Sequence, residues 1–226
     1  MTGIHPEYWG MISYSDAMAR MDQAWRLAHE HGAPGAIFYL EHEEVITCGR
    51  ATPPSHLHRI PHDLPVHEAP RGGLATYHGP GQLAGYCVID LKRRAGPMKP
   101  DIHEFIRAIE EGISRFLVVQ HQISCYSREG LTGVWTGSAE SPRKIASIGI
   151  SVRRWITTHG FALNVEPDLA RFECIVPCGN SKDEMTSIRR ECELAGRQYD
   201  RLPQNLIAAQ LHECMKAALA EKGWLE

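Results

Sequence analysis

The chain has 226 residues, of which 43% are hydrophobic and 23% are charged, a composition typical of an ordinary soluble globular protein. Its length suits one domain spanning residues 1–226. The net charge of −3 argues against general nucleic-acid binding, and no apolar run approaches the roughly 18 residues of a membrane span. Seven cysteines without framework spacing and the lack of a secretory signal favour a cytoplasmic protein with reduced thiols.

Helical periodicity is strong at three places in the chain. We expect a helix from Ser15 to His31, capped by Ser15 or Asp16 and ended by Gly32. A second helix is predicted from Asp101 to Gln120 and a third from about Pro203 to Gly223. The apolar positions expected to face the core in the last helix are Leu206, Ile207, Leu211, Met215 and Leu219.

Strands are expected between these helices. AIFYLE and VITCG flank the polar stretch EHEE, which predicts a hairpin. Further along, GVW, KIASIGISV and WITTHGFALNV follow one another between Gly130 and Val165 as strands. Strands mixed with helices, without regular β–α alternation, predict a single α+β domain.

Metal binding is not expected from the histidines. His56, His58, His62 and His67 lie in a proline-rich segment that we interpret as an irregular loop, and the chain contains no CxxC or HExxH.

A glycine-rich segment, RGGLATYHGPGQLAGY, runs from Arg71 to Tyr86 and contains five glycines. Such density indicates backbone that bends sharply or approaches a ligand, and a long turn between strands is the alternative. A phosphate-binding loop is not favoured, because no GxxxxGK[ST] is present.

Lys144 precedes an alternating strand in RKIASIGISV. Ala146, Ile148, Ile150 and Val152 should face the core, and the same parity would bury Lys144. Burial favours the neutral amine of a lysine, which is how lysines serve as bases, although an exposed lysine at a strand end is the alternative. In the next strand, His159 is either a third catalytic group or simply packed with Phe161 and Leu163.

Cys178 lies in the turn-forming stretch IVPCGN, between Pro177 and Gly179. This setting would present a thiol on a bend, whereas most buried cysteines only pack.

Together, RGGLATYHGPGQLAGY, GVW, KIASIGISV, WITTHGFALNV and PCGN, in this order, resemble the lipoyl(octanoyl) transferases. The resemblance covers roughly the middle two-thirds of the chain, and the RGG-x-x-TYHGPGQL block is the specific part. It implies the fold of the biotin and lipoate protein ligases, a mixed, largely antiparallel sheet flanked by helices. It also implies that Cys178 is the acyl-thioester nucleophile and Lys144 its partner. The substrate-binding residues implied are Arg71, Gly72, Gly73, Leu74, Ala75, Thr76, Tyr77, His78, Ser147, Ile148, Gly149, Gly160, Phe161 and Ala162.

The resemblance further implies the partners of the reaction. The donor would be octanoyl-acyl carrier protein, and the acceptors would be lipoyl domains of 2-oxoacid dehydrogenase complexes and the glycine cleavage H protein. A thioester already carries the energy for amide formation, so neither ATP nor a metal cofactor is expected. Backbone N–H groups near Cys178 and Gly179, or in the Arg71 loop, would hold the oxyanion. We expect a monomer.

The donor is acidic, so docking should use a basic patch. The candidates are LKRRAGPMKP, with Arg93 and Arg94, and the pair Arg153 and Arg154. The pair lies about 30 Å along its strand from Lys144 at roughly 3.3 Å per residue, so we favour LKRRAGPMKP.

Three other functions stay open. The chain could be an ATP-using lipoate or biotin ligase of the same fold. It could be a cysteine amidase or protease, with His78 or His159 as the base. It could also be a module that binds acyl carrier protein without catalysis.

Overall fold

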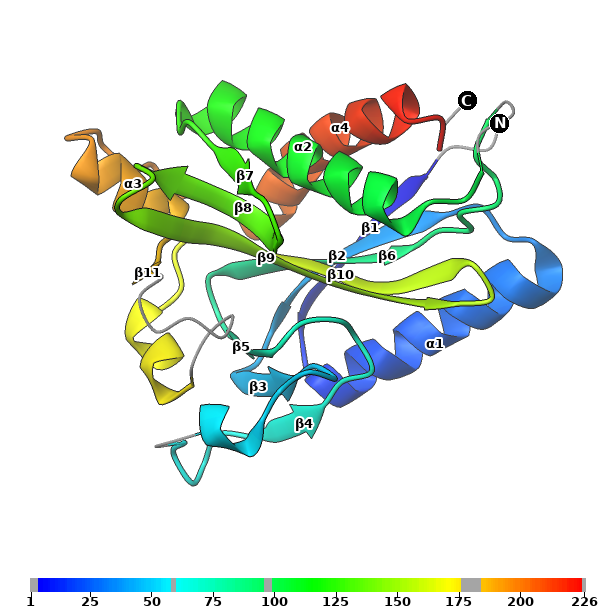
Figure 1. Cartoon of the computed structure of the whole chain (residues 1–226), viewed down its shortest axis with the longest axis horizontal. Coiled ribbons are helices and arrows are strands. Elements are labelled where there is room, and N and C mark those ends of the chain that lie inside the picture. Colours follow the sequence, from blue (N-terminus) through cyan, green and yellow to red (C-terminus); the bar gives the residue numbers. More distant parts are fainter. Residues whose placement is uncertain (1–3, 58–59, 96–98, 176–183, 225–226) are drawn as a thin grey trace.

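The computed structural model describes residues 4–57, 60–95, 99–175 and 184–224, which fold into two β-sheets and flanking helices (Figure 1). The larger sheet has eight strands in the order β1-β2-β6-β10-β9-β8-β7, with β11 beside β9. All of its pairs are antiparallel except β1 with β2 and β11 with β9. The predicted mixed, largely antiparallel α+β fold is therefore confirmed. The strands of this sheet are β1 (His5–Ile12), β2 (Ala36–His42), β6 (Gln82–Val88), β7 (Tyr126–Arg128), β8 (Leu131–Gly137), β9 (Pro142–Arg153), β10 (Ile156–Asn164) and β11 (Glu184–Met185).

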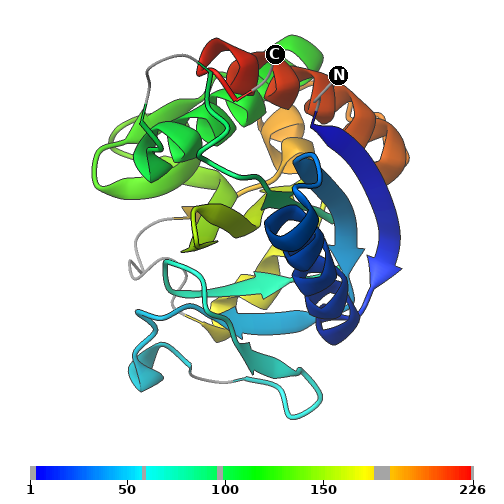
Figure 2. The ribbon, with the colours of Figure 1, turned by 90° about the vertical axis from the view of Figure 1, so that its right-hand side faces the viewer.

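A small second sheet lies on one side of the larger one (Figures 1 and 2). It contains β3 (Val45–Cys48) between β4 (Val66–Glu68) and β5 (Ala75–His78). Two short 3₁₀ helices, η1 (Pro54–His56) and η2 (Leu169–Cys174), accompany it. The α1 helix (Tyr14–His31) covers the same side of the large sheet.

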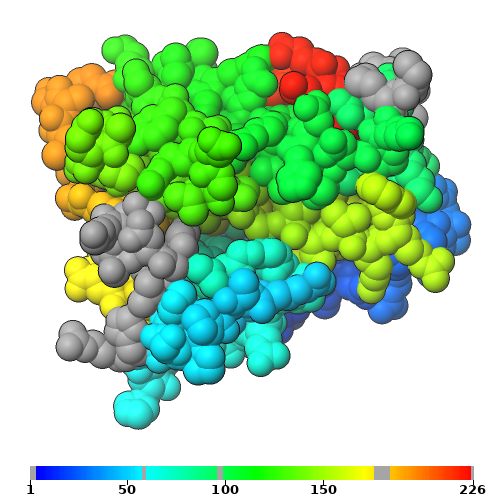
Figure 3. All heavy atoms as spheres, in the orientation of Figure 1, coloured from blue at the N-terminus to red at the C-terminus, as the bar shows by residue number. Residues whose placement is uncertain are grey.

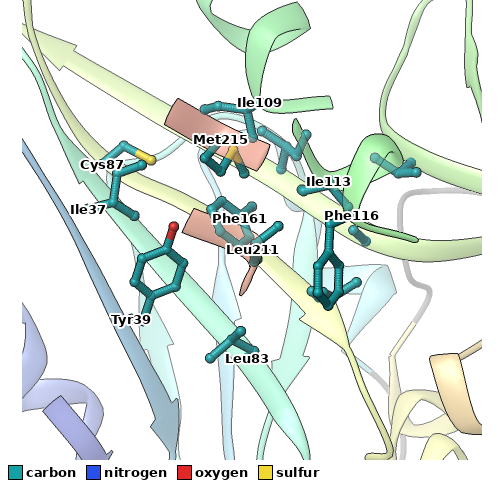
Figure 4. Close-up of a cluster of buried hydrophobic side chains, with 14 of the residues drawn as sticks. Ile37, Tyr39, Leu83, Cys87, Ile109, Ile113, Phe116, Phe161, Leu211 and Met215 are labelled. Atoms are coloured by element: carbon teal, nitrogen blue, oxygen red, sulfur yellow. The ribbon is translucent and has the colours of Figure 1, made fainter. Parts of the chain in front are cut away.

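The opposite side of the large sheet is covered by α2 (Ile102–His121) and α4 (Gln204–Glu221), with α3 (Ile188–Leu194) at one end. Strand alternation explains how both faces are filled. Ile37 and Tyr39 of β2 face α2 and α4, whereas Phe38 and Leu40 face α1. Figure 4 shows the first of these layers, where Phe161 of β10 lies among residues of β2, α2 and α4.

The three long helices form close to where the sequence predicts them. Gly32 ends α1 in the left-handed conformation, at φ +62°, as expected. The predicted N-cap is wrong: Ser13, not Ser15 or Asp16, accepts the N–H of Asp16, so the helix begins one residue earlier. Asp101 caps α2 by accepting from the N–H groups of His103 and Glu104. In α4, Leu206 is 45% exposed and does not face the core, contrary to expectation.

The predicted hairpin is wrong. AIFYLE and VITCG are both strands, but β2 pairs with β1 and β6, and β3 pairs with β4 and β5 in the other sheet. The chain changes sheets at Glu43 and Glu44, and neither is a residue that two-residue hairpin turns require. Partners distant in sequence decided the pairing of both strands.

No helix of the described residues is long and apolar enough to cross a membrane. Within the same ranges, no three His, Cys, Asp or Glu side chains gather closely enough to hold a metal ion. The predicted irregular histidine segment is partly regular, since His67 lies in β4 and its ring is 5.1 Å from that of Tyr14. His58 lies outside the described residues.

Candidate active site

The glycine-rich segment crosses from the small sheet to the large one. Its first part forms β5 and its last part forms β6, and the turn between them contains Gly79 and Gly81. Gly81 has φ +84°, and a Cβ there would lie 2.7 Å from the carbonyl oxygen of Glu166. Only glycine tolerates both conditions. The sharp bend predicted from the glycine density is therefore present at this turn.

Arg71 fixes the loop that precedes β5. Its side chain is buried, and Nη1 donates to the carbonyl oxygens of Gly72 and Leu74 at 3.0 and 2.9 Å. Nη2 donates to the carbonyl oxygen of Thr47 at 2.8 Å and to its hydroxyl at 2.7 Å. The Gly72 N–H in turn donates to the carbonyl oxygen of Ile150, 3.1 Å away on β9. The loop is thus held against the strand that contains Lys144.

Lys144 is buried, with 5% of its surface exposed, although the strand parity from which its burial was predicted does not hold. Its Nζ lies 4.9 Å from the centre of the Trp135 ring on β8, a cation–π contact. A Cβ added to Gly133 would lie 2.5 Å from Lys144 Cε and 2.6 Å from the Ala146 carbonyl oxygen. The lysine side chain therefore extends along β9 toward Ala146, through space that exists because residue 133 is glycine.

The alternation assumed from the sequence is not continuous through this strand. Lys144 pairs with Trp135 and Ala146 with Val134, so a β-bulge leaves Ile145 as the extra residue on β9. Ile145 is fully buried, although parity would have turned it to the other face. At the far end, Val152 is 39% exposed instead of facing the core.

A cavity of about 260 Å³ opens beside Lys144. It lies where the loop before β5, from the small-sheet layer, meets β9 and the first residues of β8. In Figure 3 these cyan and green layers adjoin on the front face. The predicted substrate-binding residues in its lining are Gly72, Gly73, Leu74, Ala75, Thr76, Ser147, Ile148 and Gly149, together with Lys144.

A smaller cavity of about 40 Å³, called the narrow cavity, adjoins the first, because Thr76, Ser147 and Gly149 line both. The remaining predicted residues in its lining are Arg71, His78, Gly160, Phe161 and Ala162. Tyr77 behaves differently from the other predicted residues: its hydroxyl donates to Glu44 Oε1 at 2.8 Å, and its ring packs on Phe172. The three predicted stretches thus meet around two adjoining cavities, with Tyr77 directed elsewhere.

The narrow cavity depends on two paired glycines, Gly149 of β9 and Gly160 of β10. A Cβ at Gly149 would lie 3.0 Å from Arg71 Cδ, and one at Gly160 would lie 2.0 Å from the carbonyl oxygen of Gly85. Side chains at these positions would push the strands and the Arg71 loop apart.

Buried histidines adjoin the narrow cavity on its polar side. His78 Nδ1 donates to Gln82 Oε1 at 2.6 Å, and His78 Nε2 accepts from the Thr47 hydroxyl at 3.2 Å. Burial, reinforced by His42 and Arg71, holds the pKa of His78 well below its usual value. His42 is similar: burial lowers its pKa to about 4, and its Nε2 accepts from the Tyr86 hydroxyl at 2.6 Å. These imidazoles are neutral parts of a fixed network at pH 7.

His159 departs from the strand pattern. Its φ of +58° is left-handed, an uncommon conformation for a residue other than glycine. Its ring contacts Tyr86, on the α1 face of the sheet, instead of following Phe161 into the opposite core. Burial, followed by the charges of Arg71 and Arg50, lowers the pKa of His159 to about 4.

Cys178 lies outside the described residues, as do Pro177 and Gly179. The described chain resumes at β11, where Met185 pairs with Lys144 and the Thr186 N–H donates to the Lys144 carbonyl oxygen at 3.0 Å. The segment that follows Cys178 in sequence therefore returns to the position of Lys144.

Sequence reasoning missed several residues of these cavities. Tyr14, Thr47 and Tyr86 line the narrow cavity, and Gly133 and Trp135 surround the lysine. Tyr86 stands at the end of the glycine-rich block, and Gly133 interrupts a strand, so both carried a signal. Tyr14 and Thr47 are placed by long-range packing and carried none.

The preference for LKRRAGPMKP as the docking patch assumed that this segment lies nearer to Lys144 than Arg153 and Arg154 do, and this assumption is wrong. The Leu91 N–H donates to the Trp155 carbonyl oxygen at 2.8 Å, so Leu91 and the two arginines that follow it lie at the same end of the sheet as Arg153 and Arg154. Arg93 donates to the carbonyl oxygen of Gly32 at 2.8 Å, and Arg94 to that of Lys222 at 2.7 Å. Both arginines therefore stabilise the fold through hydrogen bonds to backbone carbonyl oxygens.

Comparison with known proteins agrees with this geometry. Residues 13–215 match the family model of the lipoyl protein ligase A/B catalytic domain. The chain belongs to this family. An octanoyltransferase of Rhodospirillum rubrum is 43% identical over 180 residues, which cover 78% of this chain and 80% of that protein.

Solved structures of low sequence identity share the fold. A bipartite lipoate protein ligase of Thermoplasma acidophilum superposes with a TM-score of 0.63 at 17% identity, covering 97% of this chain and 84% of that one. The biotin protein ligase of Aquifex aeolicus gives a TM-score of 0.50 at 11% identity, covering 98% and 70%. The predicted biotin and lipoate protein ligase fold is confirmed.

Proposed function

We propose that this enzyme transfers an octanoyl group from octanoyl-acyl carrier protein to the lysine amine of lipoyl domains, through a thioester on Cys178. The acceptors would be lipoyl domains of 2-oxoacid dehydrogenase complexes and the glycine cleavage H protein. The observation that carries the proposal is Lys144, buried beside a cavity lined by the glycine-rich loop and paired with Met185, just beyond the segment that contains Cys178.

The chemistry consists of two acyl transfers. In the first, the Cys178 sulfur attacks the thioester carbonyl, the carbon–sulfur bond to the carrier breaks, and the carrier leaves as a thiol. In the second, the acceptor lysine amine attacks the acyl-enzyme thioester, an amide forms, and the Cys178 thiol is restored. We assign Lys144 to accept the thiol proton in the first step and pass it to the departing sulfur of the carrier, and to accept the amine proton in the second step and return it to the Cys178 sulfur. The balance requires no ATP and no metal.

The two cavities suit the two parts of the acyl group. The wider one, beside Lys144, would hold the thioester carbonyl. The narrower one, of about 40 Å³, has room for roughly three waters, and we assign it to the acyl chain. Phe161 and Ala162 supply apolar contact there.

The relatives favour a transferase over an ATP-using ligase. The Rhodospirillum rubrum relative and one from Dinoroseobacter shibae, 38% identical over 79% of this chain, are both named octanoyltransferase. The solved lipoate and biotin ligases resemble the chain through the fold alone, at 17% identity and below.

The buried histidines argue against a cysteine hydrolase. A Cys–His pair needs an imidazole nitrogen directed at the thiol. Both ring nitrogens of His78 are occupied, by Gln82 and by Thr47. His159 pairs with Ile150, near the end of β9 remote from Lys144.

Intact-protein mass spectrometry after mixing with octanoyl-acyl carrier protein tests the proposal. Without ATP, wild type should gain one octanoyl group, removable by hydroxylamine, and pass it to a lipoyl domain. Cys178→Ala should gain none, whereas Cys48→Ala, which changes a half-buried cysteine of β3, should behave as wild type. An octanoyl adduct on Cys178→Ala would show that Cys178 is not the nucleophile. A requirement for ATP and free octanoate would favour the ATP-using ligase. If wild type forms no adduct and Cys178→Ala binds the carrier as well as wild type does, the non-catalytic binding module is favoured.

We also propose that residues 1–226 form one catalytic domain that acts as a monomer in the cytoplasm. The composition and the odd number of cysteines support the location. Light scattering of the purified chain tests the oligomeric state.

A further inference from the structure

A third cavity lies beyond the narrow one. It measures about 410 Å³ and is lined on one side by Met18 and Met21 of α1 and on the other by Ser151 and Val152 of β9. Tyr14 and His159 line this cavity and the narrow one. These two side chains therefore lie between the narrow cavity and the larger third one, and we call them the partition. The narrow cavity and the wider one beside Lys144 are together called the channel.

The partition stands at about the depth that an eight-carbon chain reaches. Lys144 Cε and the Ala146 carbonyl oxygen lie near each other, since a Cβ on Gly133 would be 2.5 Å from the first and 2.6 Å from the second, so we measure the depth from Ala146. From Ala146 to Gly149, at roughly 3.3 Å per residue, β9 advances about 10 Å. An extended eight-carbon chain is about 9 Å long, given carbon–carbon bonds of about 1.5 Å in a zigzag. His159 pairs with Ile150, one residue beyond Gly149.

The backbone of His159 is bent to place its ring at this position. Its left-handed φ of +58° is costly for a side chain with a Cβ, and such outliers persist where the surrounding structure enforces them. The conformation turns the imidazole away from Phe161 toward Tyr86 and α1. The His159 N–H lies 3.1 Å from the sulfur of Met21, which further fixes the strand against the helix.

Tyr14 is equally fixed. It is the first residue of α1, directly after the Ser13 cap, and only 8% of its surface is exposed. Its ring packs between His42, 5.6 Å away, and His67, 5.1 Å away. A chain end that met this ring would find no side chain free to swing aside.

We propose that Tyr14 and His159 close the far end of the acyl channel and thereby set the longest acyl chain that the enzyme accepts. The proposal rests on the proposed function, since it concerns the acyl group that the enzyme transfers. The cavity of about 410 Å³ behind the partition then receives the tail of a longer chain only when one of the two side chains is removed. One methylene more than a pocket accommodates typically costs about 10–200-fold in rate, so a closed end would discriminate sharply.

Competition among acyl carrier proteins of different chain length tests this inference. Wild type is mixed with equal amounts of octanoyl-, decanoyl- and dodecanoyl-carrier, and the initial rates of adduct formation are read by mass spectrometry. Tyr14→Ala and His159→Gly should each raise the dodecanoyl-to-octanoyl ratio by at least about tenfold, the low end of the effect of one methylene. Glycine at 159 keeps the left-handed backbone without strain.

Met18→Ala is the matched control, because Met18 lines the cavity behind the partition and not the channel. It should leave the ratio of wild type unchanged. The inference is overturned if folded Tyr14→Ala and His159→Gly both keep the ratio of wild type, or if Met18→Ala shifts it as much as they do.

A binding measurement separates this inference from the proposed function. The rise in melting temperature caused by free octanoate or dodecanoate reports occupancy of the channel without any chemistry. If wild type forms no adduct but dodecanoate stabilises Tyr14→Ala and not wild type, the function fails and the partition stands. If adducts form and neither assay distinguishes the variants from wild type, the function stands and the partition fails.

Discussion

The two faces of the large sheet are built from different residues. Toward α2 and α4 the buried layer is mostly apolar, with Tyr39, Phe161 and Leu211 among its members (Figure 4), although Glu110 of α2 and His212 of α4 are buried too. Toward α1 and the small sheet, apolar residues share the interior with Arg71, His42, His78 and other buried polar groups. One face therefore gains stability from burial, while the other desolvates polar groups that must all be paired.

The difference shows how the fold divides its tasks. The hydrogen bonds of the polar face run from Arg71 through Thr47 to His78 and on to Gln82. This network adjoins the narrow cavity, whereas Phe161 and Ile148 of the apolar layer line the other walls of the two cavities. Such a network fixes loop and strand positions more narrowly than apolar packing does. Substitutions on the two faces should consequently separate activity from stability.

The largest effect is expected from Lys144. Lys144→Ala should slow acylation of the enzyme by about 10²–10⁴-fold, the range for a positioned acid–base group. Lys144→Arg should recover little, because a guanidinium stays protonated and cannot accept a proton. Stopped-flow or quenched mass spectrometry with octanoyl-carrier gives the rates. Lys216→Ala, an exposed lysine of α4, is the control. Full activity of the arginine variant would limit Lys144 to an electrostatic role.

The apolar face should show the reverse behaviour. Leu211 is fully buried in α4, and Leu211→Ala should lower the free energy of unfolding by about 2–5 kcal/mol. The folded fraction should keep its kcat, since Leu211 itself lines neither of the two cavities. Leu206→Ala, on the same helix but 45% exposed, should change stability by less than about 0.5 kcal/mol. Urea titrations compare the two, and equal losses would contradict the assignment of these helix faces.

The polar face should make the protein sensitive to acid. Burial lowers the pKa of His42 and of His159 from 6.5 to about 4, so the unfolded chain binds more protons between these values. Stability is therefore complete above about pH 6.5 and is lost as the pH falls toward 4, by at most roughly 3 kcal/mol for each histidine. His42→Asn should flatten this dependence in urea titrations at pH 7 and pH 4.5. His62→Asn, at an exposed position, should not, and an unchanged slope in His42→Asn would refute the idea.

The long helices and the strands β9 and β10 were predictable because their signals are local. Apolar spacing in α2, the Asp101 cap and the alternation of β9 and β10 each lie within a few residues. The β2–β3 hairpin failed because either strand could pair with its neighbour or with distant strands, and local pattern does not distinguish these choices.

The same distinction between local signals and long-range packing applies to the residues of the site. The glycines marked the loop, and the resemblance to the lipoyl(octanoyl) transferases marked Lys144. The parity argument for its burial failed, because the β-bulge at Ile145 is not visible in the sequence. The left-handed backbone of His159 and the placement of Tyr14 at the channel end could not be predicted, because both depend on α1 packing against β10. The position of the basic segment after β6 was also unpredictable, since it depends on the pairing of Leu91 with Trp155.

The smallest effect is expected from that basic segment, and it should be on stability. Only 7% of the Arg94 side chain is exposed; it donates to Glu104 and stacks on the Trp224 ring at 4.5 Å. Arg94→Glu should therefore lower the free energy of unfolding by roughly 1–2 kcal/mol, the cost of losing a charged hydrogen bond.

Arg94→Glu also tests whether the donor binds at this end of the sheet. The KM for octanoyl-carrier and its dependence on salt should stay as in wild type, because the segment lies at the end of the sheet remote from Lys144. Lys92→Glu, at an exposed neighbouring position, should change neither stability nor KM. Steady-state kinetics at low and high salt on the folded proteins decide the matter. A raised KM with a flattened salt dependence in either variant would mean that the carrier docks at this end of the sheet after all.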